Sequence, residues 1–231
     1  MNKRDKLIVE DINKFRVLSR DQIIDLYFSH LKNPISTCNL VLKRLQDRGY
    51  IKACKDFRPY LYVSVDSKIK ENSQKALHFL KIVDVYIQLK KYDRKVSHVL
   101  IEPKVGTKGT VEPDLFCIFR NTPFFIEVQR SVYSEKVMSE KIDRYERLYD
   151  SREWKRFEWQ QEGKEVFPIV ILITDTHYRI ESELKILQFP DIHALMKKYG
   201  KQENRKPLET NKNAVSKQIA SQNGSIKIVV K

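Results

Sequence analysis

Long hydrophobic runs are absent from this sequence, and cysteine is scarce. The longest apolar stretches are far shorter than the roughly 18 to 20 residues that cross a bilayer as a helix, so we expect no membrane partner. The charged start, Met1 to Lys6, precedes no apolar segment with a cleavage site, which argues against a secretion signal. Cys38, Cys54 and Cys117 lie far apart without metal-ligand spacing, and we therefore expect reduced thiols in a cytoplasmic protein.

Acidic residues are too few to balance the basic ones. The chain has 44 Lys and Arg against 30 Asp and Glu, a net charge of +14. Residues 1–66 carry 13 basic and 8 acidic side chains, and residues 201–231 carry 7 and 2, so each segment has a net charge of +5. A basic surface alone would also suit solubility or contact with acidic lipids. The N-terminal residues also have the pattern of a DNA-binding module, described next. We therefore expect DNA as the partner, and duplex DNA in the first instance.

Residues 5–65 are predicted to form three helices followed by a two-stranded wing. Apolar residues recur at helical spacing in the first helix, and Ser19-Arg20-Asp21-Gln22 is a capping box that starts the second. After Asn33-Pro34 a third helix is expected to begin at residue 35 or 36 and to end before Gly49. The strands of the wing are predicted at residues 50–52 and 60–63. This order is typical of a winged helix-turn-helix domain, which we place at residues 1–66.

The outer face of the third helix and the tip of the wing are expected to contact DNA. Short polar residues in the first turn and basic residues further on are typical of a recognition helix in a major groove. The predicted contacts are Ser36, Thr37, Asn39, Lys43 and Arg44 on the helix, and Lys52, Lys55 and Arg58 on the wing. The alternative is a winged helix that binds protein and whose charged face is merely solvated.

Residues 67–200 are expected to form a second, α/β domain behind a short polar linker. A long helix from Ser73 is apolar around more than half of its circumference, which predicts burial on two sides. The remaining elements are predicted as a strand at 96–101, a loop at 102–110, a hairpin, a helix at 134–149, strands at 167–174 and 184–189, and a helix at 191–199. This order is similar to the restriction-endonuclease-like α/β sandwich core. The segment 201–231 is predicted to be a disordered basic tail.

The hairpin at residues 111–129 is predicted to bring two carboxylates together. Asp114 opens its first strand and Glu127 closes its second, and these two ends are neighbours in an antiparallel pair. Two carboxylates at one sheet end suit Mg²⁺ or Mn²⁺, because these cations prefer oxygen ligands. The pattern Pro-Asp, spacer, Glu-x-Gln is similar to the PD-(D/E)xK nuclease motif, with Gln129 at the position of the lysine.

Phosphodiester hydrolysis at such a site needs a cation held by the acids and a positive group beside them. We expect Asp84 on the preceding helix to be a further metal ligand, and Lys136 or Lys141 to replace the missing lysine. Gln129 carries no charge but can hydrogen-bond a water or a phosphate. The predicted catalytic residues are Asp114, Glu127, Gln129 and Lys141, and the predicted metal ligands are Asp114, Glu127 and Asp84. In the alternative reading Glu127 simply pairs with a lysine, and His78 is a hydrogen-bonded packing residue.

The N-terminal module and four further segments together resemble the plasmid replication-relaxation protein family. These segments are Leu77-His78-Phe79-Leu80-Lys81-Ile82-Val83-Asp84-Val85-Tyr86, Glu112-Pro113-Asp114, Phe125-Ile126-Glu127-Val128-Gln129-Arg130-Ser131 with Lys141 and Tyr145, and Ile169-Val170-Ile171-Leu172-Ile173-Thr174. The resemblance spans about residues 5–190. It implies a winged helix joined to a degenerate nuclease-like domain on a mobile genetic element. It also implies that the position of Gln129 is frequently not lysine.

Three functions follow from these features as alternatives. The first is a DNA-binding protein of a plasmid or other mobile element that acts in replication or conjugative transfer, with other replication or transfer proteins as partners. The second is an active Mg²⁺- or Mn²⁺-dependent DNA endonuclease, which requires a lysine amine beside the two carboxylates. The third is a transcriptional regulator whose second domain serves for homodimerisation or for binding another partner, which predicts an exposed apolar patch and no cleft containing both carboxylates.

Overall fold

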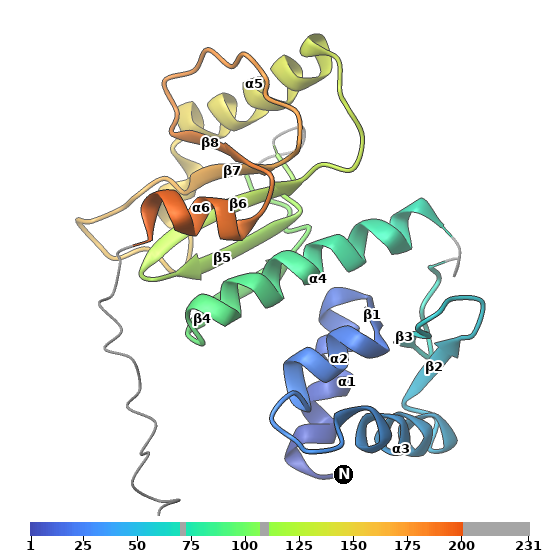
Figure 1. Cartoon of the computed structure of the whole chain (residues 1–231). Helices are drawn as coiled ribbons and strands as arrows, with labels where there is room; N and C mark the ends of the chain where they lie inside the picture. Colours follow the sequence, from blue (N-terminus) through green and yellow to red (C-terminus); the bar gives the residue numbers. More distant parts are fainter. Residues whose placement is uncertain (70–72, 107–110, 201–231) are drawn as a thin grey trace, which may run out of the picture.

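The computed structural model describes residues 1–69, 73–106 and 111–200 (Figure 1). Within these residues the chain forms six α-helices, one short 3₁₀ helix and two β-sheets of three and five strands, which confirms a mixed α and β architecture. No helix in the described part is both long enough and apolar enough to cross a membrane. The predicted tail at 201–231 and parts of the predicted linker and loop (70–72 and 107–110) lie outside the described residues.

The N-terminal module contains three helices and a three-stranded antiparallel sheet of order β1-β3-β2. The predicted capping box is present, with the Ser19 hydroxyl accepting from the Gln22 N–H and the Gln22 side chain accepting from the Ser19 N–H. Gly49 has a φ of +70° just after the third helix, as predicted. The elements are α1 (Lys3–Phe15), β1 (Val17–Ser19), α2 (Arg20–Tyr27), α3 (Pro34–Asp47), β2 (Ile51–Cys54) and β3 (Leu61–Ser64).

The prediction missed β1 and placed the start of α3 one or two residues late. Three residues are too few to show an alternating pattern, and β1 is a strand only because it pairs with β3. Helix α3 begins at Pro34, where proline costs no hydrogen bond because the first amides of a helix have no partner. Val41, Leu42 and Leu45 on the inward face of this helix are buried.

The C-terminal module is a five-stranded sheet of order β4-β5-β6-β7-β8 covered by helices on both faces. Strands β4, β5 and β6 are antiparallel, whereas β6, β7 and β8 are parallel, so α5 lies on the crossover between β6 and β7. The elements are α4 (Gln74–Tyr92), β4 (Val96–Ile101), β5 (Leu115–Phe119), β6 (Thr122–Val128), α5 (Glu135–Ser151), η1 (Glu153–Arg156), β7 (Ile169–Ile173), β8 (Ile186–Phe189) and α6 (Ile192–Tyr199).

Two hydrophobic clusters lie on opposite faces of this sheet. One face packs Leu115, Ile126 and Ile171 against α4 and α6. The other face packs Phe116, Phe125 and other residues against α5. The buried stripe of α5 contains Met138, Ile142, Tyr145 and Leu148, whereas Val137 is exposed.

Helix α4 is buried on two sides, as its composition predicts. Ile82, Val85 and Leu89 belong to the cluster on the sheet, whereas Val83, Tyr86 and Ile87 belong to the core of the N-terminal module. The boundary expected near residue 66 falls between β3 and α4 in the chain. The two modules still share packing across this boundary, because α4 contributes residues to both cores.

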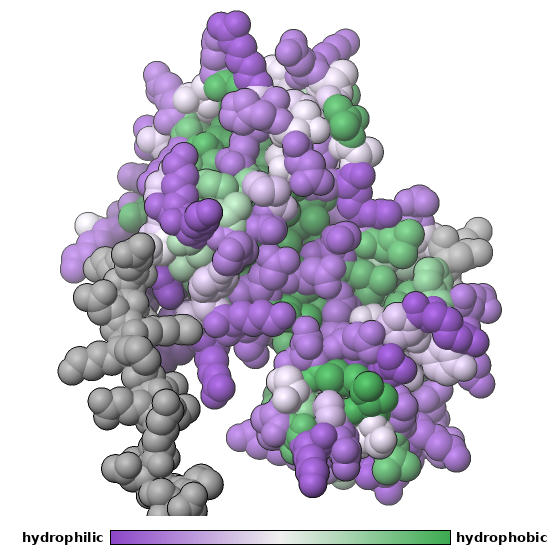
Figure 2. Space-filling view, viewed as in Figure 1, coloured by the Kyte–Doolittle hydropathy of each residue, from purple (hydrophilic) through white to green (hydrophobic). Residues whose placement is uncertain are grey.

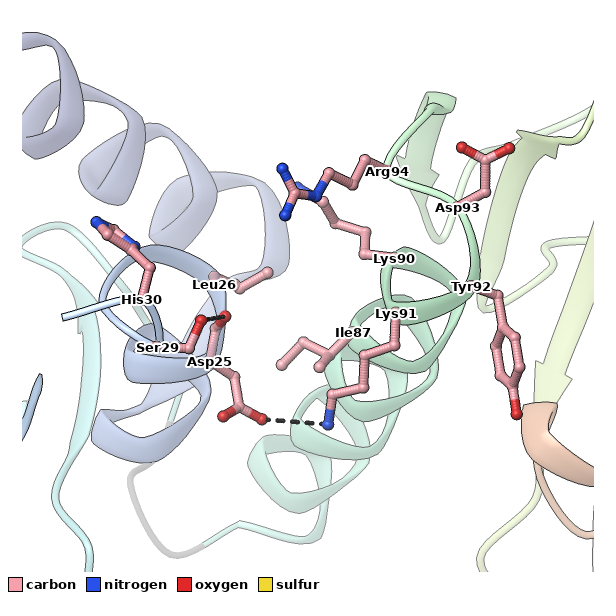
Figure 3. Close-up of a pocket in the computed structure, with 10 residues that line it drawn as sticks. All are labelled: Asp25, Leu26, Ser29, His30, Ile87, Lys90, Lys91, Tyr92, Asp93 and Arg94. Carbon is pink, nitrogen blue, oxygen red and sulfur yellow. Dashed lines mark hydrogen bonds and ion pairs between the residues drawn. The ribbon is translucent and has the colours of Figure 1, made fainter. Parts of the chain in front are cut away.

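A groove of about 610 Å³ marks the line where the two modules meet (Figure 3). Its walls are the end of α2 with the following turn and the C-terminal end of α4. The Lys91 amine and the Asp25 carboxylate, 3.6 Å apart, join the two walls. Nearer the start of α4, the Gln22 side-chain amide donates to the Leu80 carbonyl oxygen at 2.8 Å. The apolar residues of α4 hold the two modules together, and these polar contacts join α2 to α4 at two points along the helix.

The shared helix predicts that the described modules unfold together. Ile82→Ala on the sheet side and Ile87→Ala on the N-terminal side should each lower the free energy of unfolding by about 2–5 kcal/mol, since both leave a cavity in a core. Chemical denaturation followed by circular dichroism should show one transition in both variants. Lys81→Ala, an exposed change on the same helix, is the control and should have an effect within about 0.5 kcal/mol. Two separate transitions would contradict a shared core.

Candidate functional site

Asp114 and Glu127 are neighbours at one end of the five-stranded sheet, as predicted. The pairing of Leu115 with Ile126 places Asp114, just before β5, beside the last residues of β6. The Val128 N–H donates to Asp114 Oδ2 at 2.7 Å, so the carboxylate of Asp114 is fixed to the neighbouring strand. Glu127 is only 3% exposed. The two acids therefore form a partly buried pair rather than two solvated surface groups.

Two side chains of α5 hold the carboxylate of Glu127. The Lys141 amine donates to Oε2 at 2.5 Å, and the Tyr145 hydroxyl donates to Oε1 at 2.6 Å. Lys141 and Tyr145 are four residues apart and so lie on the same face of the helix. Of the two candidate lysines, Lys141 reaches the acid pair, whereas Lys136 is exposed to solvent on the same helix. The Lys141 amine therefore contacts the Glu127 carboxylate directly.

Burial dominates the acidity of this pair. It raises the pKa of Glu127 from 4.5 to about 7, and the nearby charge of Asp114 acts in the same direction while Lys141 opposes it. Burial lowers the pKa of Lys141, but the charges of Glu127 and Asp114 outweigh it, so the pKa of Lys141 is raised overall. Both groups are therefore shifted toward their protonated forms, Glu127 by burial and Lys141 by the neighbouring carboxylates.

Asp114 has a partner of its own on α4. His78 Nε2 lies 2.9 Å from Asp114 Oδ1. This hydrogen bond raises the pKa of His78 above 6.5, although burial opposes it. The expectation that His78 is a hydrogen-bonded packing residue agrees with this contact. Each of the two carboxylates thus faces one basic side chain, from α4 for Asp114 and from α5 for Glu127.

Gln129 is turned toward a tyrosine. Its side-chain amide donates to the hydroxyl of Tyr178, which also accepts from the Tyr133 N–H at 2.9 Å. Gln129 Oε1 is buried and has no hydrogen-bond partner among the described residues. No pattern in the sequence points to Tyr178, which is buried in the segment between β7 and β8. Only the fold brings it to Gln129.

The structure does not bring Asp84 to the other two acids. Its Oδ1 accepts from the Gln22 side-chain amide at 2.7 Å, on the side of α4 that faces α2. The expectation of a third acidic ligand is therefore not met. In the described part of the chain no group of three or more His, Cys, Asp or Glu side chains is arranged to hold a metal ion. Positions 78 and 84 lie on different sides of α4. His78 therefore contacts Asp114, whereas Asp84 contacts Gln22 on α2.

The predicted DNA contacts lie mostly on exposed surface. Ser36, Asn39 and Lys43 on α3 are exposed, as are Lys52, Lys55 and Arg58 on the β2–β3 hairpin. Two predicted residues, Thr37 and Arg44, are only partly exposed and have internal partners. The Thr37 hydroxyl donates to the Asn33 carbonyl oxygen at 2.9 Å, and the Arg44 guanidinium pairs with the buried carboxylate of Asp5. Arg44 thus ties α3 to α1, because a buried charge needs a partner.

An exposed leucine on α3 was not predicted. Leu40 is 70% exposed and lies on the helix beside Asn39 and Lys43. The hydrophilic surface in Figure 2 is interrupted by small hydrophobic patches. A single exposed leucine is common and needs no explanation. Leu40 is notable because it lies among the polar residues predicted to contact DNA. The sequence signal was present, since residues 36, 39, 40 and 43 share that face.

Comparison with known proteins gives one finding. The family model described as replication-relaxation matches residues 61–158. This confirms the resemblance over a segment that runs from β3 to just beyond η1 and contains His78, Asp114, Glu127 and Lys141. No curated protein and no solved structure matches the chain. Helices α1 to α3 and Tyr178 lie outside the matched segment.

The raised pKa values predict that this site is less stable at higher pH. The folded chain holds the Glu127 proton more tightly than the unfolded chain, whose pKa is near 4.5. The resulting stabilisation is complete below the unfolded pKa and is lost as the pH rises through about 7. His78 acts in the same direction above pH 6.5. Between about pH 5 and about pH 8, Glu127→Gln should therefore lose about 1–3 kcal/mol less unfolding free energy than the wild type.

Urea unfolding of both proteins at the two pH values measures this difference. Glutamine keeps an acceptor for Tyr145 but has no proton to lose in this range. Glu135→Gln, an exposed change on the first turn of α5, serves as the control. Equal pH dependence in Glu127→Gln and the wild type would show that Glu127 is ionised throughout.

Proposed function

We propose that this chain, whose residues 61–158 match the replication-relaxation family, is a duplex-DNA-binding protein of a plasmid or other mobile element. It would act in replication or transfer of that element. The observation that carries the proposal is the exposed face of α3, which combines Ser36, Asn39, Leu40 and Lys43 beside a hairpin rich in basic side chains. Such a face has both the polar groups that read bases and the charges that bind phosphates.

The arrangement of the N-terminal module supports a winged helix-turn-helix. Its element order is α1-β1-α2-α3-β2-β3, and its hairpin strands are packed behind α3. In this interpretation α3 is the recognition helix and the β2–β3 hairpin is the wing. Asn39 would bond an adenine edge, Leu40 would contact a thymine methyl group, and Lys43 would contact a phosphate. Lys52 and Lys55 would bind the backbone beside the groove.

This proposal predicts different effects for neighbouring residues on α3. Lys43→Ala should weaken binding to all duplex sequences alike and should lower the slope of log affinity against log salt by about one. Asn39→Ala should instead reduce the preference for the best sequence, by about 1–3 kcal/mol of discrimination. Fluorescence anisotropy with labelled duplexes at several salt concentrations measures both quantities.

Lys6→Ala provides the matched control for Lys43→Ala. Lys6 is an exposed lysine on α1, so Lys6→Ala removes the same charge from a different helix of the module. If Lys6→Ala and Lys43→Ala weakened binding equally, the charge of the whole chain would drive binding and α3 would have no special role.

The C-terminal module supports a divergent nuclease-like domain. The order α4-β4-β5-β6-α5-β7, with a helix on each face of the sheet, agrees with the sandwich expected for such a core. Asp114 and Glu127 are adjacent, whereas the regulator alternative predicts only that no cleft contains both of them. In the first proposal this module contacts the DNA backbone near the site that α3 recognises.

A second candidate function, metal-dependent cleavage of DNA, is favoured by the position of Lys141. Its amine contacts the carboxylate of Glu127 and so stands where a charge-stabilising group is needed. Asp114 and Glu127 would hold a Mg²⁺ or Mn²⁺ ion as two oxygen ligands, with water and phosphate oxygens completing the shell. Such an ion would polarise the phosphate and make a bound water more acidic.

The donor set fits this ion only in part. The four carboxylate oxygens already accept bonds from, or contact, His78, Val128, Lys141 and Tyr145. Lys141 would have to turn from Glu127 toward the phosphate, where it would stabilise the negative charge that develops during cleavage. The buried Glu127 would also have to release its proton, which a nearby cation favours.

Nicking of supercoiled plasmid DNA tests the second candidate. It predicts cleavage that requires Mg²⁺ or Mn²⁺, disappears in Asp114→Ala and Glu127→Ala, and falls by about 10²–10³ in Lys141→Met. Lys136→Met is the matched control, because Lys136 lies on the same helix but is exposed and should be dispensable. Folded protein that binds DNA without nicking it would leave only the first proposal.

A further inference from the structure

We infer that a cavity beside the carboxylate pair binds an unpaired base of single-stranded DNA, an inference that rests on the proposed DNA-binding function. The cavity has a volume of about 370 Å³. Its floor is formed by Phe116 and Phe125 on the sheet, and its walls include Phe157 and Trp159 from the segment after η1. This is a concave aromatic site of a size that suits a small planar ligand.

The cavity lies at the same end of the sheet as the two acids. Phe125 and Glu127 are two residues apart on β6, so their side chains share one face at a spacing of about 7 Å. The segment Pro103 to Val105, which lines the cavity, follows Glu102, whose N–H donates to the Asp114 carbonyl oxygen at 3.1 Å. A strand of DNA held at the acids would therefore have a neighbouring nucleotide at the cavity.

The aromatic walls have surface available for a ligand. Trp159 is partly exposed, and its ring centroid lies 5.3 Å from that of Phe116 and 6.0 Å from that of Phe157. No acceptor for its indole N–H is found among the described residues. Leu100 on β4, paired with Phe116, is 50% exposed at the edge of the same cavity. An indole offers a stacking face and a hydrogen-bond donor, and bases of any sequence can stack on it.

Charge around the cavity selects a nucleotide over an uncharged apolar ligand. Lys104 and Arg156 line it and are exposed, and neither forms an ion pair within the part of the chain that the structure describes. Glu158 is the acid among the lining residues, so the cations exceed the acids. Aromatic surface with basic side chains around it is the combination by which proteins bind single strands.

An unpaired base is required because paired bases do not expose their faces. In duplex DNA each base is stacked between its neighbours, so only a single strand or a displaced nucleotide can place its ring against Trp159. The chain would thus bind DNA that is duplex at α3 and unpaired at the cavity. This assigns a substrate class, a junction between duplex and single-stranded DNA, to the C-terminal module.

Tryptophan fluorescence gives a direct test, because the chain has only two tryptophans. Trp154 is 4% exposed and donates its N–H to the Tyr149 carbonyl oxygen, so Trp154→Phe removes the buried signal and leaves Trp159 as the reporter. Titration with oligo(dT) should quench this emission until it saturates. Trp159→Leu in the wild-type background should weaken oligo(dT) binding by about tenfold.

A pair of neighbouring basic residues controls for charge and for folding. Arg156 lines the cavity, whereas Lys155 lies over the ring of Trp154 and does not line it. Both are exposed, so neither change should disturb the core. Arg156→Ala should weaken oligo(dT) binding several-fold, and Lys155→Ala should leave it nearly unchanged. Equal effects of the two changes would overturn the inference.

Duplex binding measured on the same proteins separates this inference from the proposed function. If oligo(dT) binds without changing Trp159 emission while Lys43→Ala still weakens duplex binding, only the cavity is wrongly assigned. If neither duplex nor oligo(dT) binds to the folded wild type, the proposed DNA-binding function fails and the inference fails with it. Saturable quenching that Arg156→Ala weakens, with duplex binding intact in that variant, supports both.

Discussion

The burial of one helix between two cores is the constraint on which this structure depends. Helix α4 supplies Ile82 to the cluster on the sheet and Val83 to the core of the N-terminal module. Neither module can bury its apolar surface without it, and hydrophobic burial is the main favourable term in folding. The same helix carries His78 to Asp114 at one end and Lys91 to Asp25 at the other. The position of the acids relative to the N-terminal module is therefore set by packing.

The chemistry of the site follows from a second burial, that of the Glu127 carboxylate. A buried charge is costly unless it is paired, and here α5 supplies both a cation and a hydroxyl. Lysine and tyrosine four residues apart satisfy both oxygens because they lie on one helix face. The pKa of Glu127 still stays near 7, so burial outweighs the pairing. The site therefore favours a protonated Glu127 more than an exposed position would.

Local patterns predicted the elements well and the partners of side chains only in part. The capping box at Ser19, the hairpin that joins Asp114 to Glu127, and the two-sided α4 could be read from the sequence because each depends on residues close together in the chain. Strand β1 could not, since it exists through pairing with β3. Nor could the contact between Gln129 and Tyr178, which joins residues 49 positions apart. The pairing of Arg44 with the buried Asp5 could not be read either, because Asp5 lies on another helix.

The carboxylate pair is complete in its own hydrogen bonds, and this has a consequence for how the site can change. Asp114 and Glu127 are satisfied by His78, Val128, Lys141 and Tyr145, so folding requires no bound ion to neutralise them. In sites where a metal holds repelling acids together, loss of the metal also costs stability. Here the acids and the lysine satisfy one another within the fold. Packing alone therefore gives a reason to keep these residues, whether or not they take part in a reaction.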